Sequence, residues 1–151
     1  MKPPANWIKV NIDGSSFNDG RTGAGGIVRD HEAKLVMAFS QQLDIETNNY
    51  SEAKAAWFEV HWCLSNGYFN IILECDSMLI IHMLQGKTNI PWHLQPIVKQ
   101  VKKMVEQGNN NIKFSHCFRE GNQVADVMAK LGANGYDMVI SDPGDLPRQA
   151  L

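Results

Sequence analysis

The segment from residue 8 to residue 13 constrains the fold more than any other part of this sequence. Apolar and polar residues alternate along it, which is the period of a half-buried β-strand. Gly14 ends the alternation and leaves the carboxylate of Asp13 at the end of the strand. An Asp-Gly pair after an apolar run also forms ordinary turns, so this segment alone is a weak signal. Its weight comes from three further carboxylates, which also lie where predicted elements begin or end.

Composition narrows the class of protein. The 151 residues are 44% hydrophobic, which fits one domain with its own core. The net charge of −2 gives no overall basic field, so any contact with nucleic acid must rest on local patches. Three widely spaced cysteines without a CxxC pair argue against disulfides or zinc and favour a reducing compartment. With no signal peptide and no apolar run of about 18 residues, we expect an intracellular monomer, nuclear or cytoplasmic, without a membrane partner.

The order of predicted elements indicates an α/β fold. Turn-rich segments separate three strands, at 7–13, 24–29 and 34–40, which predicts an antiparallel meander. Helices and strands then alternate: a helix at 49–66, a strand at 70–75, helices at 77–85 and 93–107, a strand near 112–118 and a helix at 122–131. This order predicts a mixed five-stranded sheet flanked by helices. We expect residues 1–6 to be a linker or flexible N-terminus and 134–151 to be an irregular tail.

Right-handed crossover connections place the strand at 70–75 parallel to the strand at 7–13. Asp13 and Asp76 then lie side by side where the strand ends open a crevice. Glu52 lies in the first turn of the first long helix. Asp126 lies in the first turns of the last helix, one turn after Asn122 and on the same face. The sequence therefore predicts a cluster of four carboxylates.

Four converging acids repel one another, and their pKa values rise unless a cation binds among them. Hard oxygen ligands suit Mg²⁺ or Mn²⁺. Two such ions about 3.5–4 Å apart would clamp a phosphodiester, one activating water and the other stabilising the leaving oxygen. Taken singly, Glu52 is also explained as a partner of the helix dipole, Asp76 as a cap and Asp126 as a solvated charge.

Several short segments form one combined pattern between residues 7 and 133: Val10-Asn-Ile-Asp-Gly-Ser15, Gly23-Ala-Gly-Gly-Ile-Val28, Thr47-Asn-Asn-Tyr-Ser-Glu-Ala53, Glu74-Cys-Asp-Ser77, Arg119-Glu-Gly-Asn-Gln-Val-Ala-Asp126 and Ala129-Lys130. The combination resembles the type 1 ribonuclease H family. It is most similar to the ribonuclease H domains attached to plant non-LTR (LINE-type) retrotransposon reverse transcriptases.

The resemblance implies a ribonuclease H-like fold over residues 7–133. It also implies that Asp13, Glu52, Asp76 and Asp126 are catalytic and hold two Mg²⁺ ions, with Mn²⁺ as a substitute. The family hydrolyses the RNA strand of RNA/DNA hybrids and leaves 3′-hydroxyl and 5′-phosphate ends. Fusion to a reverse transcriptase in a larger polyprotein is a further implication.

The resemblance also assigns substrate contacts. Asn48 and Asn49 match asparagines that enter the minor groove near the RNA 2′-hydroxyls, and Thr47 matches a residue near the DNA-strand phosphate. Asparagine offers both a donor and an acceptor, and the 2′-hydroxyl is what distinguishes RNA from DNA. Asn48 or Asn49 would also serve as an ordinary helix cap, so the groove-reading and capping roles both stay open.

The sequence departs from the family pattern in two places. Many relatives carry a flexible histidine in the loop before the last carboxylate, whereas Arg119–Asn122 has none. His116 falls in a predicted strand and is interpreted as structural. We count Arg119 as a substitute for that histidine, with a plain surface charge as the alternative, and we count Asn122 among the substrate-binding residues.

The second departure is the absence of the basic protrusion with which some relatives grip the hybrid. The corresponding stretch, Gln85–His93, contains Lys87 as its only lysine or arginine. We expect Trp92 within it to be buried by packing. A helical stripe of three lysines is either a solvated face or a contact to DNA phosphates: Lys99, Lys102 and Lys103.

We therefore expect a hydrolase, a metal-dependent endonuclease acting on RNA/DNA hybrids. One alternative is a catalytically silent hybrid- or dsRNA-binding module derived from a retroelement, which the four intact acids disfavour. Another keeps the fold but changes the chemistry, as in exonucleases or transposase-type DNA-cutting enzymes, which the segment Thr47–Asn49 disfavours.

Overall fold

The computed structural model describes residues 3–147, and within them the chain forms one mixed sheet of six strands. Strands β1 (Ile8–Ser16), β2 (Thr22–Arg29) and β3 (Leu35–Leu43) form the predicted antiparallel meander. Strands β4 (Asn70–Cys75) and β5 (Asn111–His116) continue the sheet beyond β1, both in parallel pairing. The sheet order is β5-β4-β1-β2-β3-β6, so the predicted α/β architecture is confirmed.

The sixth strand corrects two predictions, the five-stranded sheet and the irregular tail. Strand β6 (Met138–Ile140) pairs antiparallel with β3, and a 3-10 turn η2 (Pro143–Asp145) follows it. Ile140 is buried against Ile27, Ala38 and Met128, all distant in sequence. A three-residue strand is too short to show a period, so only this packing specifies it. Residues 148–151 of the predicted tail and 1–2 of the predicted linker lie outside the described part.

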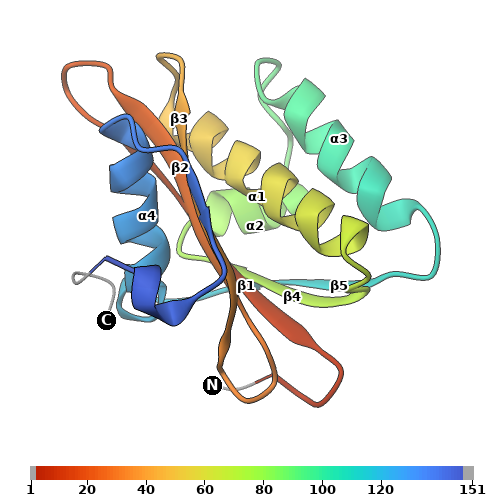
Figure 1. The fold of residues 1–151 in the computed structure, drawn as a ribbon. Helices are drawn as coiled ribbons and strands as arrows, with labels where there is room; N and C mark the ends of the chain where they lie inside the picture. The colour runs from red at the N-terminus through yellow and green to blue at the C-terminus, as the bar shows by residue number, and fades with distance from the viewer. Residues whose placement is uncertain (1–2, 148–151) are drawn as a thin grey trace.

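The helices cover both faces of the sheet (Figure 1). Helices α1 (Asn48–Ser65), α2 (Met78–Leu84) and α3 (Gln95–Glu106) share one face and pack into the larger hydrophobic cluster. Helix α4 (Gln123–Ala133) covers the opposite face, where it contacts β1, β2 and β3. A 3-10 turn, η1 (Arg119–Asn122), leads directly into α4. No helix in residues 3–147 is long and apolar enough to cross a membrane.

Two side-chain caps set where α1 and α2 begin. Thr47 Oγ1 accepts a hydrogen bond from the Tyr50 amide at 3.2 Å, and Ser77 Oγ accepts one from the Ile80 amide at 3.3 Å. Such caps satisfy backbone donors that have no partner within the helix. The first cap puts Glu52 near the start of α1, and the second leaves Asp76 just ahead of α2.

Glycines allow α4 to lie directly on β2. A Cβ atom at Gly23 would lie 2.1 Å from the Ala133 amide nitrogen, and one at Gly25 would lie 2.2 Å from the Ala129 amide nitrogen. Any larger residue would push the helix away from the sheet. The contact therefore sets the distance between α4 and the sheet, and with it how near Asp126 lies to Asp13 on β1.

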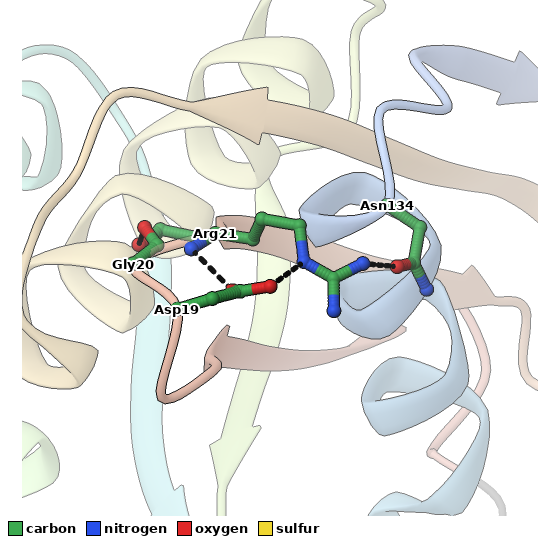
Figure 2. A network of polar contacts seen from close by, with 5 residues as sticks. Asp19, Gly20, Arg21 and Asn134 are labelled. Atoms are coloured by element: carbon green, nitrogen blue, oxygen red, sulfur yellow. Dashed lines mark hydrogen bonds and ion pairs between the residues drawn. The ribbon is translucent and has the colours of Figure 1, made fainter.

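A polar network ties the β1–β2 hairpin to the end of α4 (Figure 2). Arg21 Nε donates to Asp19 Oδ2 at 2.7 Å, and the same guanidinium donates to Asn134 Oδ1. Asn134 is the C-cap of α4. The Arg21 and Asp19 side chains are both largely exposed, so the network orients the hairpin more than it stabilises the fold.

Candidate active site

Parallel pairing of β1 and β4 brings Asp13 and Asp76 to the same edge of the sheet. Ile12 pairs with Cys75 in the register; Asp13 is the next residue along β1, which continues to Ser16, and Asp76 directly follows the last residue of β4. This is the arrangement that the element order predicts. The carboxyl ends of neighbouring parallel strands thus form the base of the site.

Gly14 allows Glu52 to join the two aspartates. A Cβ atom on Gly14 would lie 2.1 Å from Ser51 Oγ and 2.8 Å from the Glu52 amide nitrogen. The first turn of α1 therefore lies directly on the backbone of β1. Glu52 is only 4% exposed and Asp13 only 5%, so both carboxyls face the interior of the site.

The electrostatics show how closely the acids converge. Burial, followed by the charges of Asp76 and Glu52, raises the pKa of Asp13 from 3.8 to about 8, although a hydrogen bond from the Gly14 amide lowers it. Burial and the charge of Asp76 raise the pKa of Glu52 from 4.5 to about 7, against hydrogen bonds with Ser77 and Asp13. Part of the cluster is thus protonated near neutral pH, and a cation bound among the acids would lower these pKa values again.

The donor set fits a hard divalent cation. One atom each from Glu52, Cys75 and Asp76 lie within 4.8 Å of one another. Burial raises the pKa of the Cys75 thiol well above 9.0, so its sulfur stays protonated and is a poor ligand. The carboxylate oxygens remain as donors, and Mg²⁺ and Mn²⁺ prefer them.

Asp126 lies beside this group rather than within it. Its charge contributes to raising the pKa of Asp13, so the two side chains are near each other. Its carboxylate also forms an ion pair with Lys130 one turn further along α4, at 2.9 Å. The structure therefore brings three predicted acids together and places the fourth at their margin, paired with a lysine.

A polar pocket of about 420 Å³ opens over the carboxylates. Its lining comes from the start of α1, the β4–α2 junction and the segment after β5: Asn48, Asn49, Glu52, Asp76, Ser77, His116, Cys117, Phe118 and Arg119. Two of the predicted metal ligands, Glu52 and Asp76, thus share one pocket with the predicted groove-reading asparagines and Arg119. His116 lies in β5, as expected from the sequence, but the strand ends there rather than near residue 118, and His116 also lines this space.

The helix cap distinguishes between the two roles considered for the asparagines. Thr47 supplies the side-chain cap of α1, whereas Asn48 and Asn49 are the first residues of the helix itself. Among residues 3–147, neither asparagine side chain has a hydrogen-bond partner. Their amides are therefore available to a ligand in the pocket, and the capping explanation for them is wrong.

Asn122, which was predicted to bind substrate, is buried inside the fold. It is 1% exposed, its Nδ2 donates to the Ile12 carbonyl at 2.7 Å, and its Oδ1 accepts from Asn11 Nδ2 at 3.2 Å. The prediction that it binds substrate is not supported, because both ends of its amide are used within the fold. Asn122 instead holds the start of α4 against β1, which positions Asp126.

Two aromatic side chains are exposed although the sequence did not predict it. Trp92, expected to be buried, is 82% exposed in the α2–α3 connection. Phe118, which the sequence did not single out, is 77% exposed at the carboxylate pocket. Trp92 lies outside any periodic segment, and Phe118 follows β5, which ends at His116 and not at residue 118 as predicted, so local periodicity gives no information about the exposure of either side chain. The lysine stripe does lie on α3, with Lys99 and Lys103 exposed and Lys102 half-buried.

The architecture is the ribonuclease H fold. Ribonuclease H1 from the halophilic archaeon Halobacterium salinarum has a TM-score of 0.80 to this chain at 20% identity, covering 86% of this chain and 99% of its own. LC11-RNase H1, solved in complex with an RNA/DNA hybrid, has a TM-score of 0.77 at 20% identity, covering 84% and 96%. No match was found among curated proteins.

Residues 11–132 match the reverse transcriptase-like family, and the chain belongs to that family. The foamy viral protease-reverse transcriptase in complex with an RNA/DNA hybrid shares the fold, with a TM-score of 0.67 at 16% identity. The similarity covers 86% of this chain but 20% of the viral chain. The fold therefore also occurs as one part of a larger reverse transcriptase protein.

Proposed function

We propose that this protein is a metal-dependent endonuclease that hydrolyses the RNA strand of RNA/DNA hybrids. The observation that carries the proposal is that Glu52 and Asp76 line one pocket, with Asp13 close enough for both of their charges to raise its pKa. Buried acids with raised pKa values weaken a fold unless they serve a ligand, and the ligand that suits them is a divalent cation.

Two Mg²⁺ ions, or Mn²⁺ ions in their place, would supply the attacking water and stabilise the leaving oxygen of the phosphodiester. Asp13, Glu52, Asp76 and Asp126 are the residues that would hold them. The Gly14 amide donates to Asp13 Oδ1 at 2.9 Å and so orients that carboxylate in advance. Release of the 3′ oxygen would leave the 3′-hydroxyl and 5′-phosphate ends.

The pocket also contains groups suited to selecting the RNA strand. Asn48 and Asn49 lie beside Glu52 with side-chain amides that have no hydrogen-bond partner in the described part of the chain, so they can meet 2′-hydroxyls in the minor groove. Thr47 lies just before them, exposed, at the side assigned to the DNA strand. Arg119 enters the pocket from the opposite segment of the chain and would contact a phosphate.

We further propose that the chain works beside a reverse transcriptase of a plant LINE-type retrotransposon, inside the cell. The family match supports a reverse transcriptase context, and the foamy viral structure is a precedent for the fusion. A hybrid-specific nuclease in that context would remove the RNA template after copying.

The test is cleavage of an end-labelled RNA/DNA hybrid with Mg²⁺ or Mn²⁺, beside duplex DNA and duplex RNA of the same sequence. We expect cleavage of the hybrid's RNA strand alone, lost in EDTA and in Asp76→Asn prepared identically. Extension of the products by a DNA polymerase would report 3′-hydroxyl ends. Binding without cleavage would identify a silent binding module, and cleavage of duplex DNA would identify a DNA-cutting relative; either result overturns the proposal.

A further inference from the structure

We propose that Phe118 is a substrate-positioning residue whose ring packs against a ribose of the RNA strand next to the cleaved phosphate. The inference rests on the proposed hybrid substrate and adds to it a contact that the carboxylates and asparagines do not make. It begins from an exposed aromatic ring for which the fold itself has no use.

The exposure of Phe118 is unusual for its location. Of the large apolar side chains left exposed in residues 3–147, Phe118 is the one that lines the carboxylate pocket. Its surroundings there are largely polar and charged, so the side chain gains little burial from the fold. An aromatic surface held open beside a polar site is typical of a ligand contact.

The backbone on both sides of Phe118 is held in place. The Cys117 amide donates to the Cys75 carbonyl at 2.9 Å, which continues the β4–β5 ladder, and the Gly121 amide donates to the Phe118 carbonyl at 3.0 Å. The Phe118 ring contacts the His116 ring edge to face, with centroids 5.7 Å apart and planes at 79°. The ring is therefore presented on a fixed segment, so little entropy is lost when a ligand binds it.

The layout of the pocket indicates what the ring would contact. Asn48 and Asn49 border the pocket from α1, Phe118 and Arg119 border it from the segment after β5, and Glu52 also lines it. A strand with its cleaved phosphate at the carboxylates would extend past both borders. In a paired hybrid the base faces are covered by stacking, so an aromatic ring can reach only the sugar edge of the wide, shallow minor groove. Arg119, next in the chain, would bind the adjoining phosphate.

This contact would be equally strong before and during the reaction, because the ribose beside the cleaved bond does not change. Loss of such uniform binding raises KM and leaves kcat unaltered. Loss of about 40 Å² of apolar contact between the ring and the ribose costs about 1 kcal/mol, which is about fivefold in affinity. We expect Phe118→Ala to raise KM for the hybrid by about fivefold, and Phe118→Trp to keep KM near the wild-type value.

The matched control is Phe69→Ala, which removes an exposed phenylalanine, 50% exposed, at a separate pocket between the ends of α1 and α3. KM and kcat should stay at the wild-type values in that variant. Thermal unfolding of both variants reports folding. Binding of uncleaved hybrid by fluorescence anisotropy, with Asp76→Asn as the background, measures the contact independently of cleavage.

An unchanged KM and an unchanged hybrid affinity in Phe118→Ala would overturn the inference, while wild-type cleavage would leave the proposed function intact. A loss confined to kcat would also overturn it, because the ring would then act only in the transition state. If the wild-type protein does not cleave, the proposed function fails by itself. The anisotropy measurement still decides about Phe118: weaker hybrid binding supports the contact, and equal binding refutes it.

Discussion

Replacing Asp13 with asparagine should stabilise the metal-free protein at neutral pH while abolishing its response to Mg²⁺. Asparagine has nearly the same size as aspartate, and its Oδ1 can keep the hydrogen bond from the Gly14 amide. What disappears is the charge that burial, Asp76 and Glu52 oppose. The substitution therefore removes the free-energy cost of the buried Asp13 charge while keeping the packing of the side chain.

The size of the effect follows from the pKa of Asp13, which folding raises from 3.8 to about 8. Below the lower value the carboxyl is protonated in both the folded and unfolded states, so it does not affect stability. As the pH rises from 3.8 towards 8, the unfolded chain ionises first and the folded state loses stability. Roughly three pH units separate the lower value from pH 7, each worth about 1.4 kcal/mol, so the penalty at pH 7 is about 4 kcal/mol.

Urea unfolding in EDTA, followed from pH 4 to pH 8, measures this penalty directly. We expect wild type and Asp13→Asn to have similar free energies of unfolding at pH 4, and the variant to be more stable by up to about 4 kcal/mol at pH 7. Mg²⁺ at about 100 times its Kd should narrow this difference by about 2.7 kcal/mol, because the cation stabilises the wild type alone.

An exposed aspartate in the β3–α1 loop supplies the control. Asp44→Asn removes the same charge outside the site, and its stability, Mg²⁺ response and cleavage should follow the wild type. If Asp13→Asn is no more stable than wild type in EDTA at pH 7, the argument from repulsion within the cluster is refuted. If the variant retains near wild-type cleavage, the carboxylate assignment is refuted as well.

Three further predictions concern other contacts. Changing both Asn48 and Asn49 to alanine should lower kcat/KM for the hybrid by an amount equivalent to roughly 2–6 kcal/mol of transition-state stabilisation, with little change in Tm. Thr47→Ala should instead lower the free energy of unfolding by about 1 kcal/mol, because the helix cap is lost. The opposite pattern in thermal unfolding and kinetics would contradict the groove-reading role. Gly14→Ala should displace α1 and lower kcat by about a hundredfold or more even where the variant folds, since its Cβ would lie 2.1 Å from a side-chain atom of α1; wild-type kcat would contradict the close contact. Glu59→Met should raise the free energy of unfolding at pH 7 by about 1–3 kcal/mol. The Glu59 carboxyl is fully buried and has no hydrogen-bond partner among residues 3–147, and burial raises its pKa well above 4.5. An unfolding midpoint in urea at or below that of the wild type would show that the Glu59 carboxyl has a partner.

Much of the site was predictable because it depends on where strands and helices end. The apolar run ending at Cys75 marks the end of β4, and the connection rules place β4 beside β1. The end predicted for β1 at Asp13 is wrong, because pairing with β2 continues the strand to Ser16. The position of Glu52 follows from the start of the helix after the meander. Periodicity and turn residues are local signals, so they are sufficient for these positions.

Other features depended on which of several equally suitable neighbouring residues takes a given role in the structure. Thr47, Asn48 and Asn49 are consecutive and all three can cap a helix. In the structure Thr47 is the cap, and the first turn of α1 lies against Gly14, a contact between segments that the local sequence does not specify. The two asparagines are left available to a ligand for that reason.

The sequence by itself determined the strand and helix pattern and the acids at its ends, because each depends on neighbouring residues. The tertiary structure alone decided the pairing of β6 with β3, the burial of Asn122 and the exposure of Trp92 and Phe118. Each of these depends on what a distant segment places against the residue. Periodicity reports which side of an element is covered, and it carries no information about side chains in loops and short edge strands.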